Sequence, residues 1–306
     1  MSNFPLLKLP YLCIEAVILN LSCHDIVNFS YISKRSYRLV KMFKSPVTFM
    51  RLYLDEEGTC LKLEPMKEKF ESNCLDEKFL ENINYYTSLF RCSVDNLKID
   101  GDYLPEDNIN FGFNKLKQLS ISGTKEINND KLKYLLEHFE VADTLTIDIP
   151  ISNTFNCDPK LLKTEDISFP GGKSADWITG KFLSQLGNTQ RFTFDFPQFT
   201  FKDVISVIAD WFLGRRSFLK SIIIVFKLPI HPGDLENEYF KPIPFVPERR
   251  PVGLVDSAGG LVDFSHGLDI VRSDGELATI VVEGHEFLFH VWSEDERRGL
   301  PSWTFD

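Results

Sequence analysis

Three short segments of the sequence carry residue types that support chemistry in enzymes. Residues 169–174 read Phe-Pro-Gly-Gly-Lys-Ser, and a Gly-Lys-Ser triplet after a predicted strand is part of the phosphate-binding loop motif. That motif requires another glycine five residues before the glycine of the triplet, and this chain has Ile167 there. We therefore expect no nucleotide cofactor at this segment.

The other two segments combine histidine with possible partners. Cys23, His24 and Asp25 are consecutive, and consecutive residues of a helix point in different directions, so they cannot act together as nucleophile, base and orienting group. His285 and His290 are an odd number of positions apart, which places them on opposite faces of a strand. The sequence therefore predicts no catalytic residue, no metal site and no cofactor, and we expect a protein that is not an enzyme.

Composition narrows the possible partners and the compartment. The 306 residues carry a formal net charge of -10, which argues against non-specific binding of nucleic acid. Six cysteines show no C-x-x-C pair, a pattern typical of reduced thiols, so we expect an intracellular protein in the cytoplasm or nucleus. Apart from the N-terminal stretch, the longest uninterrupted apolar run, residues 222–226, is too short to span a membrane.

The N-terminal segment is expected to form three short helices with too much apolar surface. In the first helix Ile14, Val17, Ile18 and Leu21 form one face. Leu12, Ala16 and Leu19 form a second apolar face, and a helix that is apolar all round must be buried all round. The second helix is expected to begin at Ser22 or Cys23. The third runs from Ser33 to about Lys44 and is basic, through Lys34, Arg35, Arg38, Lys41 and Lys44.

Three helices of this length cannot bury so many apolar side chains among themselves. The excess must contact either the rest of the chain or a partner protein. Periodicity alone leaves both alternatives open: a helical cap on the domain that follows, or a docking segment.

A resemblance favours the docking segment. The stretch FPLLKLPYLCIEAVILNLSCHDIVNFSYISKRSYRLVK resembles the F-box, and its opening and basic third helix look like the nematode branch of that family. Two positions depart from the family pattern: Leu12 replaces a common acidic residue, and the tryptophan common in the third helix is missing. The matching positions are Leu9, Pro10, Ile14, Val17, Ile18, Leu21, Asp25, Ile26, Phe29, Ser30, Ile32 and Leu39.

The resemblance implies a partner, the Skp-family adaptor of the Skp–Cullin–F-box ubiquitin ligase, and through it a cullin. These adaptors are acidic proteins, so a basic third helix would speed the encounter. The residues expected to contact the adaptor are Leu9, Pro10, Leu12, Ile14, Val17, Ile18, Leu21, Ile26, Phe29, Lys34 and Arg35.

From about residue 93 the chain alternates short strands with helical patterns. The first inward-facing residues of successive strands are 22 to 30 positions apart, which is close to the leucine-rich-repeat period. The inward pairs are Leu97/Ile99, Leu119/Ile121, Leu145/Ile147, Ile167/Phe169, Phe192/Phe194 and Ile222/Ile224. We expect an α/β fold with a leucine-rich-repeat-like stack of βα units, and a non-repeat α/β domain is the alternative.

The C-terminal part adds β-strands and a second resemblance. Residues 268–292 predict strands joined by turns at Asp274-Gly275 and Gly284-His285, that is, a β-hairpin or small sheet, which we expect to cover Ile223 and Val225. Residues 200–226 and 269–292 are similar to the type-two F-box-associated domain of nematode F-box proteins. The positions that carry this similarity include Thr200, Asp203, Trp211, Gly214, Asp274, Gly275 and Trp292.

The sequence thus predicts five segments. They are an F-box at 1–46, a helical or irregular connector at 47–92, a βα-repeat, substrate-binding module at 93–228, a Pro/Gly-rich loop at 229–260, and C-terminal β-strands at 261–306. The target-binding surface is either the outward strand face or a loop or C-terminal site. The outward positions are Lys98, Ser120, Thr146, Asp148, Thr193 and Asp195. The sequence identifies no target, and a scaffold without a ligase role remains the alternative function.

Overall fold

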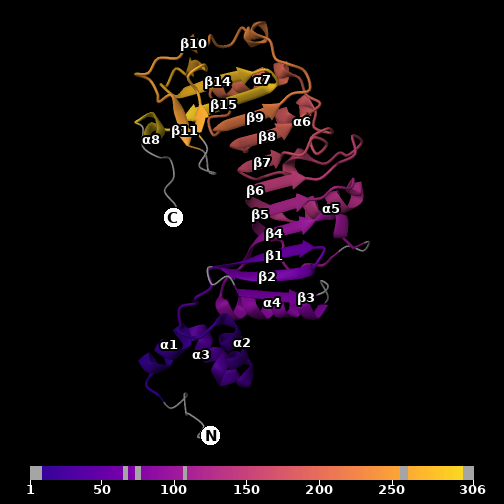
Figure 1. Ribbon diagram of the computed structural model, residues 1–306, viewed down its shortest axis with the longest axis vertical. Coiled ribbons are helices and arrows are strands. Elements are labelled where there is room, and N and C mark those ends of the chain that lie inside the picture. Colours follow the sequence, from indigo (N-terminus) through magenta and orange to yellow (C-terminus); the bar gives the residue numbers. More distant parts are fainter. Residues whose placement is uncertain (1–8, 65–67, 73–76, 106–108, 256–260, 299–306) are drawn as a thin grey trace. The chain divides into compact units, whose positions relative to one another are not determined.

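The computed structural model describes residues 9–64, 68–72, 77–105, 109–255 and 261–298 (Figure 1). The chain divides into two compact units, Met1–Ser122 and Gly123–Asp306. The predicted F-box opening before Leu9 lies outside the described residues, as do the last residues of the C-terminal segment.

Three helices begin the first unit, close to where the sequence predicts them. They are α1 (Tyr11–Leu19), α2 (Cys23–Ile32) and α3 (Lys34–Met42). The hydroxyl of Ser22 accepts a hydrogen bond from the backbone N–H of Asp25, and that of Ser33 accepts one from Ser36, each at 3.1 Å. These N-caps satisfy N–H groups that a helix leaves unpaired, which confirms both predicted helix starts.

The segment 47–92 differs from the expected helical or irregular connector. It forms three antiparallel strands followed by a long helix: β1 (Phe49–Asp55), β2 (Gly58–Glu64), β3 (Glu68–Ser72) and α4 (Glu77–Phe90). Met50, Leu52 and Leu54 alternate with less buried residues, which is the period of a strand. The intervening polar turn, with Gly58 at φ 114°, interrupts that alternation in the sequence.

The first unit continues the same sheet with parallel strands. β4 (Val94–Asp100) pairs with β1 and with β5 (Lys115–Ser122), so the order is β3-β2-β1-β4-β5. Between β4 and β5 the described residues contain a short 3-10 helix, η2 (Gly101–Tyr103).

The second unit is a mixed sheet with helices. Four strands pair in parallel in chain order: β6 (Glu140–Asp148), β7 (Asp166–Phe169), β8 (Arg191–Asp195) and β9 (Ser221–Val225). Its helices are α5 (Asn129–His138), η3 (Pro159–Leu161), α6 (Gly180–Gln185), α7 (Phe201–Phe212), η4 (Pro232–Leu235) and α8 (Glu294–Arg297).

One face of the second sheet packs against helices through aromatic side chains. Ring centroids of Trp211 in α7 and Phe289 lie 5.3 Å apart, and Phe201 and Phe287 lie 5.2 Å apart. All twelve residues predicted to point inward from the strands are buried in their own units. The α/β class is therefore confirmed, whereas the leucine-rich-repeat-like regularity stays a prediction because α-helices do not follow every strand.

The C-terminal strands extend the edge of the second sheet. β15 (Glu286–Trp292) pairs antiparallel with β9, and β14 (Leu277–Glu283), β13 (Leu268–Val271) and β10 (Ile243–Pro244) follow. Gly275 and Gly284 have positive φ at the two turns predicted from the sequence. The expectation that this sheet covers Ile223 and Val225 is wrong, because β15 lies beside β9 and leaves Ile223 45% exposed and Val225 partly exposed.

A separate hairpin covers part of the same face. It consists of β11 (Gly253–Val255) and β12 (Leu261–Asp263), and β11 lies inside the predicted Pro/Gly-rich loop. Leu254 and Val262 pack against a buried cluster that includes Val281 and Trp292 on β14 and β15. Within the described part of the chain, no helix is both long enough and apolar enough to cross a membrane.

Candidate docking surface of the N-terminal helices

A small apolar core holds the three N-terminal helices together. Ile14 and Ile18 of α1, Ile26 and Val27 of α2 and Val40 of α3 are buried. Three of these, Ile14, Ile18 and Ile26, belong to the predicted contact set. In the free chain these three side chains are buried inside the helical segment and are not accessible to a partner.

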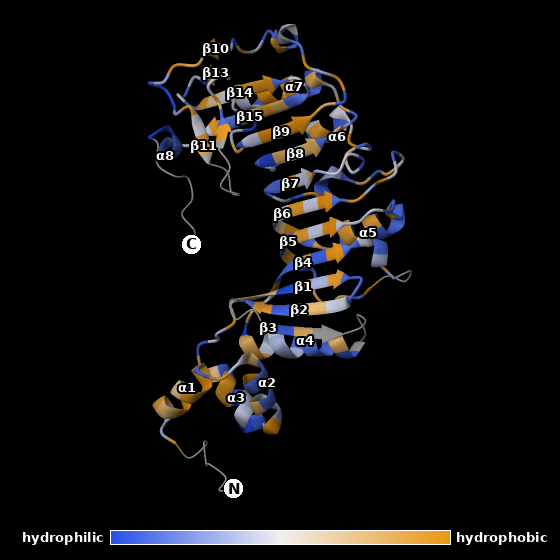
Figure 2. Ribbon diagram, viewed as in Figure 1, coloured by the Kyte–Doolittle hydropathy of each residue, from blue (hydrophilic) through white to orange (hydrophobic). Residues whose placement is uncertain are grey.

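The opposite face of α1 is exposed and apolar. Leu12 is 74% exposed and Leu19 46%, and Ala16 and Val17 between them are also exposed. Figure 2 shows α1 as hydrophobic along most of its length. No described residue covers this face, so it is a patch of the kind that marks protein–protein contacts.

Three further apolar side chains are exposed on the other two helices. Ile32 at the end of α2 is 74% exposed, Met42 at the end of α3 is 60% exposed, and Tyr31 is also exposed. These residues are absent from the predicted contact set. Ile32 matches the family pattern and so carried a signal, whereas helical periodicity gave no reason to single out Met42.

The remaining predicted contact residues divide by accessibility. Pro10, Lys34 and Arg35 are exposed, and Leu9, Leu21 and Phe29 are partly exposed. Lys34 and Arg35 lie in the first turn of α3, and Arg38 and Lys44 add exposed positive charge on and just beyond that helix. The three helices thus combine an exposed apolar strip with a basic helix.

The helices α2 and α3 rest on the segment that follows them. The hydroxyls of Ser30 and Tyr85 are 2.7 Å apart, those of Tyr37 and Ser88 are 2.8 Å apart, and the rings of Tyr31 and Tyr85 stack at 4.6 Å. Burial raises the pKa of the neighbouring Tyr86 to about 12. The segment 47–92 therefore supports α2 and α3 but leaves the outer face of α1 open.

The residues that resemble catalytic groups in the sequence are engaged in packing and in local hydrogen bonds. Cys23 is buried, the ring of His24 stacks on Phe70 at 4.5 Å, and Asp25 accepts a hydrogen bond from Ser22. The hydroxyl of Ser174, in the Gly-Lys-Ser triplet, donates to the carbonyl of Gly171 at 2.6 Å. The described residues contain no group of three or more His, Cys, Asp or Glu that could hold a metal ion.

The predicted target-binding residues lie on outward strand faces in each unit. Lys98 and Ser120 are register partners on β4 and β5 of the first unit. In the second unit Ser168 is the register partner of both Thr146 and Thr193, which brings those two onto one row across β6, β7 and β8. Asp148 and Asp195 lie two positions further along their own strands.

Comparison with known families identifies the N-terminal helices. The family model of the F-box domain matches residues 6–48, and this range includes α1, α2 and α3. The chain thus carries an F-box domain at its N-terminal helices, and this match does not extend into the rest of the chain. Comparison with curated proteins and with solved structures found no match to the chain.

Proposed function

We propose that this chain is a substrate-recognition subunit of a Skp–Cullin–F-box type ubiquitin ligase. Its F-box domain binds a Skp-family adaptor, and through it a cullin, while the remaining α/β part binds a target protein. The observation that carries this proposal is the exposed apolar face of α1, centred on Leu12 and Leu19, within the matched F-box domain.

The proposed contact surface follows from accessibility. Leu12, Val17 and Leu19 supply its apolar centre, and Ile32 and Met42 extend it. Fully burying one such side chain is worth about 1.5–3 kcal/mol, so a few of them supply much of a stable interface. Lys34 and Arg38 add positive charge that draws an acidic adaptor into encounter.

The proposed role requires no catalytic residue in this chain. A subunit that holds a target beside the ubiquitin-transferring subunits contributes proximity, which raises the effective concentration of the reacting groups. We also propose that the part after the F-box is a type-two F-box-associated domain of the nematode kind and that the protein acts inside the cell, in the cytoplasm or nucleus.

A second candidate is a protein-binding scaffold without a ligase role. The contacts of Ser30 and Tyr37 with α4 support it, because a helical cap would pack on the chain that follows it in this way. The two candidates differ in what covers α1: the scaffold requires no partner on Leu12 and Leu19.

A binding experiment with purified full-length chain separates the two. The chain is incubated with each Skp-family adaptor of its source organism, beside the variants Leu12→Asp and Leu228→Asp. Leu228 is 77% exposed and lies outside the F-box domain, so it is the matched control.

We expect the parent and Leu228→Asp to bind at least one adaptor and Leu12→Asp to bind it at least tenfold more weakly, since it introduces a charge into an apolar contact. If no adaptor binds the folded parent, the ligase proposal fails and the scaffold remains. Equal binding by all three proteins would place the contact elsewhere.

A further inference from the structure

The face of the second sheet that points away from α7 is ordered into three rows by strand register. The first row crosses Asp166, Arg191, Ser221 and His290. The second crosses Ser168, Thr193, Ile223, Leu288 and Val281, and the third crosses Asp195, Val225, Glu286 and Glu283. The face therefore carries polar side chains of both charges at one end of the strands, apolar side chains on β9, β15 and β14 in the middle, and acidic side chains at the other end.

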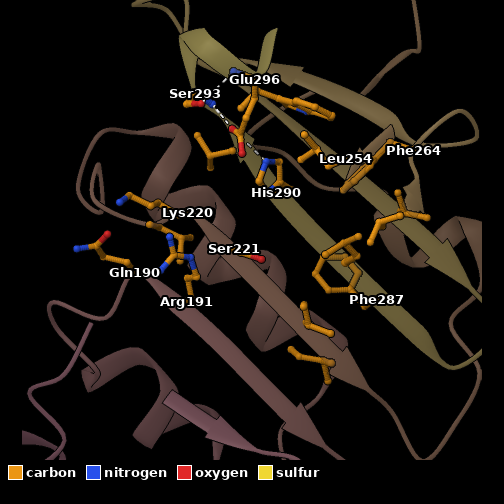
Figure 3. Close-up of a pocket in the computed structure, with 18 of the residues that line it drawn as sticks. Gln190, Arg191, Lys220, Ser221, Leu254, Phe264, Phe287, His290, Ser293 and Glu296 are labelled. Carbon is orange, nitrogen blue, oxygen red and sulfur yellow. Dashed lines mark hydrogen bonds and ion pairs between the residues drawn. The ribbon is translucent and has the colours of Figure 1, made fainter. Parts of the chain in front are cut away.

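A cavity of about 1020 Å³ lies on this face, lined by β9, β15 and the β11–β12 hairpin (Figure 3). Ile223 and Leu288 contribute apolar surface from the strands, and Leu254, Val262 and Phe264 contribute it from the hairpin segment. Ligand cavities of about 300–1,000 Å³ hold drug-sized molecules, so this volume accommodates several side chains of a bound segment.

The hairpin that walls the cavity is fixed by a buried ion pair. Arg250 donates to Asp269 at 2.7 Å and to the carbonyl of Phe264 at 3.0 Å. Both side chains of the Arg250–Asp269 pair are fully buried, and Thr279 donates to the same carboxylate at 2.9 Å. The cavity is thus a built feature of the fold with a fixed wall.

At the end of the face that carries Arg191 and His290, both side chains have carboxylate neighbours within the chain. Arg191 pairs with Asp166 at 3.0 Å. His290 Nε2 lies 3.5 Å from Glu296 Oε2, which is too long for a strong hydrogen bond but within the distance of an ion pair when the histidine is protonated. Figure 3 shows Gln190, Arg191 and Lys220 gathered on one side of the cavity, away from Leu254 and Phe264. Asp166 already pairs with Arg191 and Glu296 lies near His290, which leaves an acidic partner mainly Lys220 to meet.

The acidic end is not neutralised. Glu283 and Glu286 line the cavity, and Asp195 lies next to Val225 on the adjacent strand. Among the described residues none of these three carboxylates has an ion-pair partner. Burial, followed by the charges of Asp148 and Glu286, raises the pKa of Asp195, so a cation placed here would relieve an existing repulsion.

We propose that this cavity binds an exposed segment of a target protein that carries a bulky apolar side chain and, at the next-but-one position, a lysine or arginine. The apolar side chain occupies the space between Ile223 and the hairpin, and the cation meets Glu283 and Glu286. Alternate residues of an extended segment lie on one face, which matches the step from the apolar row to the acidic row. The proposal rests on the proposed function only in assigning the segment to a ligase target.

Selection from a pool of short randomised peptides tests the proposal with full-length chain. Retained peptides are sequenced, and the best of them is resynthesised with Lys, Gln or Glu at the basic position. We expect enrichment of Trp, Phe or Leu followed two positions later by Lys or Arg, and binding by the Glu version about tenfold weaker or worse, since it places like charges together.

Matched variants locate the contact. Glu283→Lys/Glu286→Lys should reverse the preference from Lys to Glu peptides, whereas Glu126→Lys, an exposed glutamate far along the chain, should leave it unchanged. If the double variant does not fold, the apolar contact is tested instead by comparing Ile223→Ser with Leu228→Ser. Ile223 and Leu228 are both exposed, so the two substitutions are comparable.

No enrichment, equal retention of Lys and Glu peptides, or equal losses in target and control variants would overturn the proposal. Adaptor binding is measured on the same preparations. Peptide selection without adaptor binding would leave the cavity assignment standing while the ligase role fails, and the reverse result would reject the cavity alone.

Discussion

At the scale of single residues, one buried cation organises the outer face of the second unit. Arg250 donates to Asp269, and its guanidinium lies over the rings of Phe245 and Trp292 at 4.4 and 5.2 Å. Removing one partner of such a pair leaves a buried charge without compensation, which is more costly than never having buried the pair.

We predict that Arg250→Met lowers the free energy of unfolding by about 3 kcal/mol or more, because among the described residues Asp269 then keeps only the partly exposed Arg249 as its cation. Denaturant unfolding of the full chain measures the change. The exposed variant Arg298→Met, which loses only a surface pair with Glu294, should change it by less than about 1 kcal/mol. If Arg250→Met also lowered the free energy of unfolding by less than about 1 kcal/mol, the buried pair would not have the stabilising role assigned to it.

A second residue on this face links stability to pH. Burial raises the pKa of the Glu296 carboxyl, but contact with His290 and the backbone N–H of Ser293 outweighs it and lowers the pKa to about 2. A carboxyl with a depressed folded-state pKa stabilises the fold above its ordinary pKa, 4.5 here, and loses that contribution as the pH falls toward 2.

The thermal midpoint should therefore fall between about pH 4.5 and 2 more steeply in the parent than in Glu296→Gln, which cannot change its protonation in that range. Thermal unfolding at several pH values measures both slopes. Identical slopes would show that Glu296 is not held as a carboxylate in the folded chain.

At the scale of elements, α3 supplies charge and α1 supplies apolar area, and the two should affect different rate constants. Charges at the rim of an interface mainly change the association rate, whereas buried apolar contacts change dissociation. Lys34 and Arg38 are exposed on α3, whereas the apolar strip belongs to α1.

We predict that Lys34→Glu/Arg38→Glu slows association with an acidic adaptor about tenfold at low salt and changes dissociation little. The difference should shrink in high salt, which shortens the range of the attraction. Stopped-flow or surface binding kinetics measure both constants. Lys181→Glu/Lys202→Glu, on α6 and α7, carries the same charge change and should leave association unaltered.

The elements also show which features a sequence can predict. Helix starts at Ser22 and Ser33 were predictable because a cap acts within one turn of the chain. The strands β1 and β2 had the right alternation and a typical strand length of seven residues each, so the sequence carried a signal that the connector prediction missed. The edge pairing of β15 with β9 was not predictable, because strands added at an edge or stacked on a face show the same local pattern.

The candidate sites also divide into one that depends on local sequence and was predictable and one that does not and was missed. The apolar face of α1 was predictable because helical periodicity indicates a second apolar face with Leu12 and Leu19, and that face is exposed in the structure. The cavity was invisible because its wall, the β11–β12 hairpin, begins in a Pro/Gly-rich loop and is held by Arg250 and Asp269, residues far apart in the sequence.

At the scale of the whole molecule, the proposed functions lie in different units. The F-box domain belongs to the first unit, and the cavity with its acidic end belongs to the second. A subunit that joins an adaptor to a target needs two such independent binding surfaces. We therefore predict that variants of either surface leave binding at the other unchanged.

Hydrogen–deuterium exchange of the full chain with and without a bound Skp-family adaptor tests the central claim most directly. The adaptor should slow exchange in peptides covering α1, Tyr11–Leu19, because those amides lie beneath the proposed contact. Exchange in β8 and β9 should stay the same. Protection confined to residues outside 9–42, or no protection at saturating adaptor, would contradict the assignment of α1 as the docking surface.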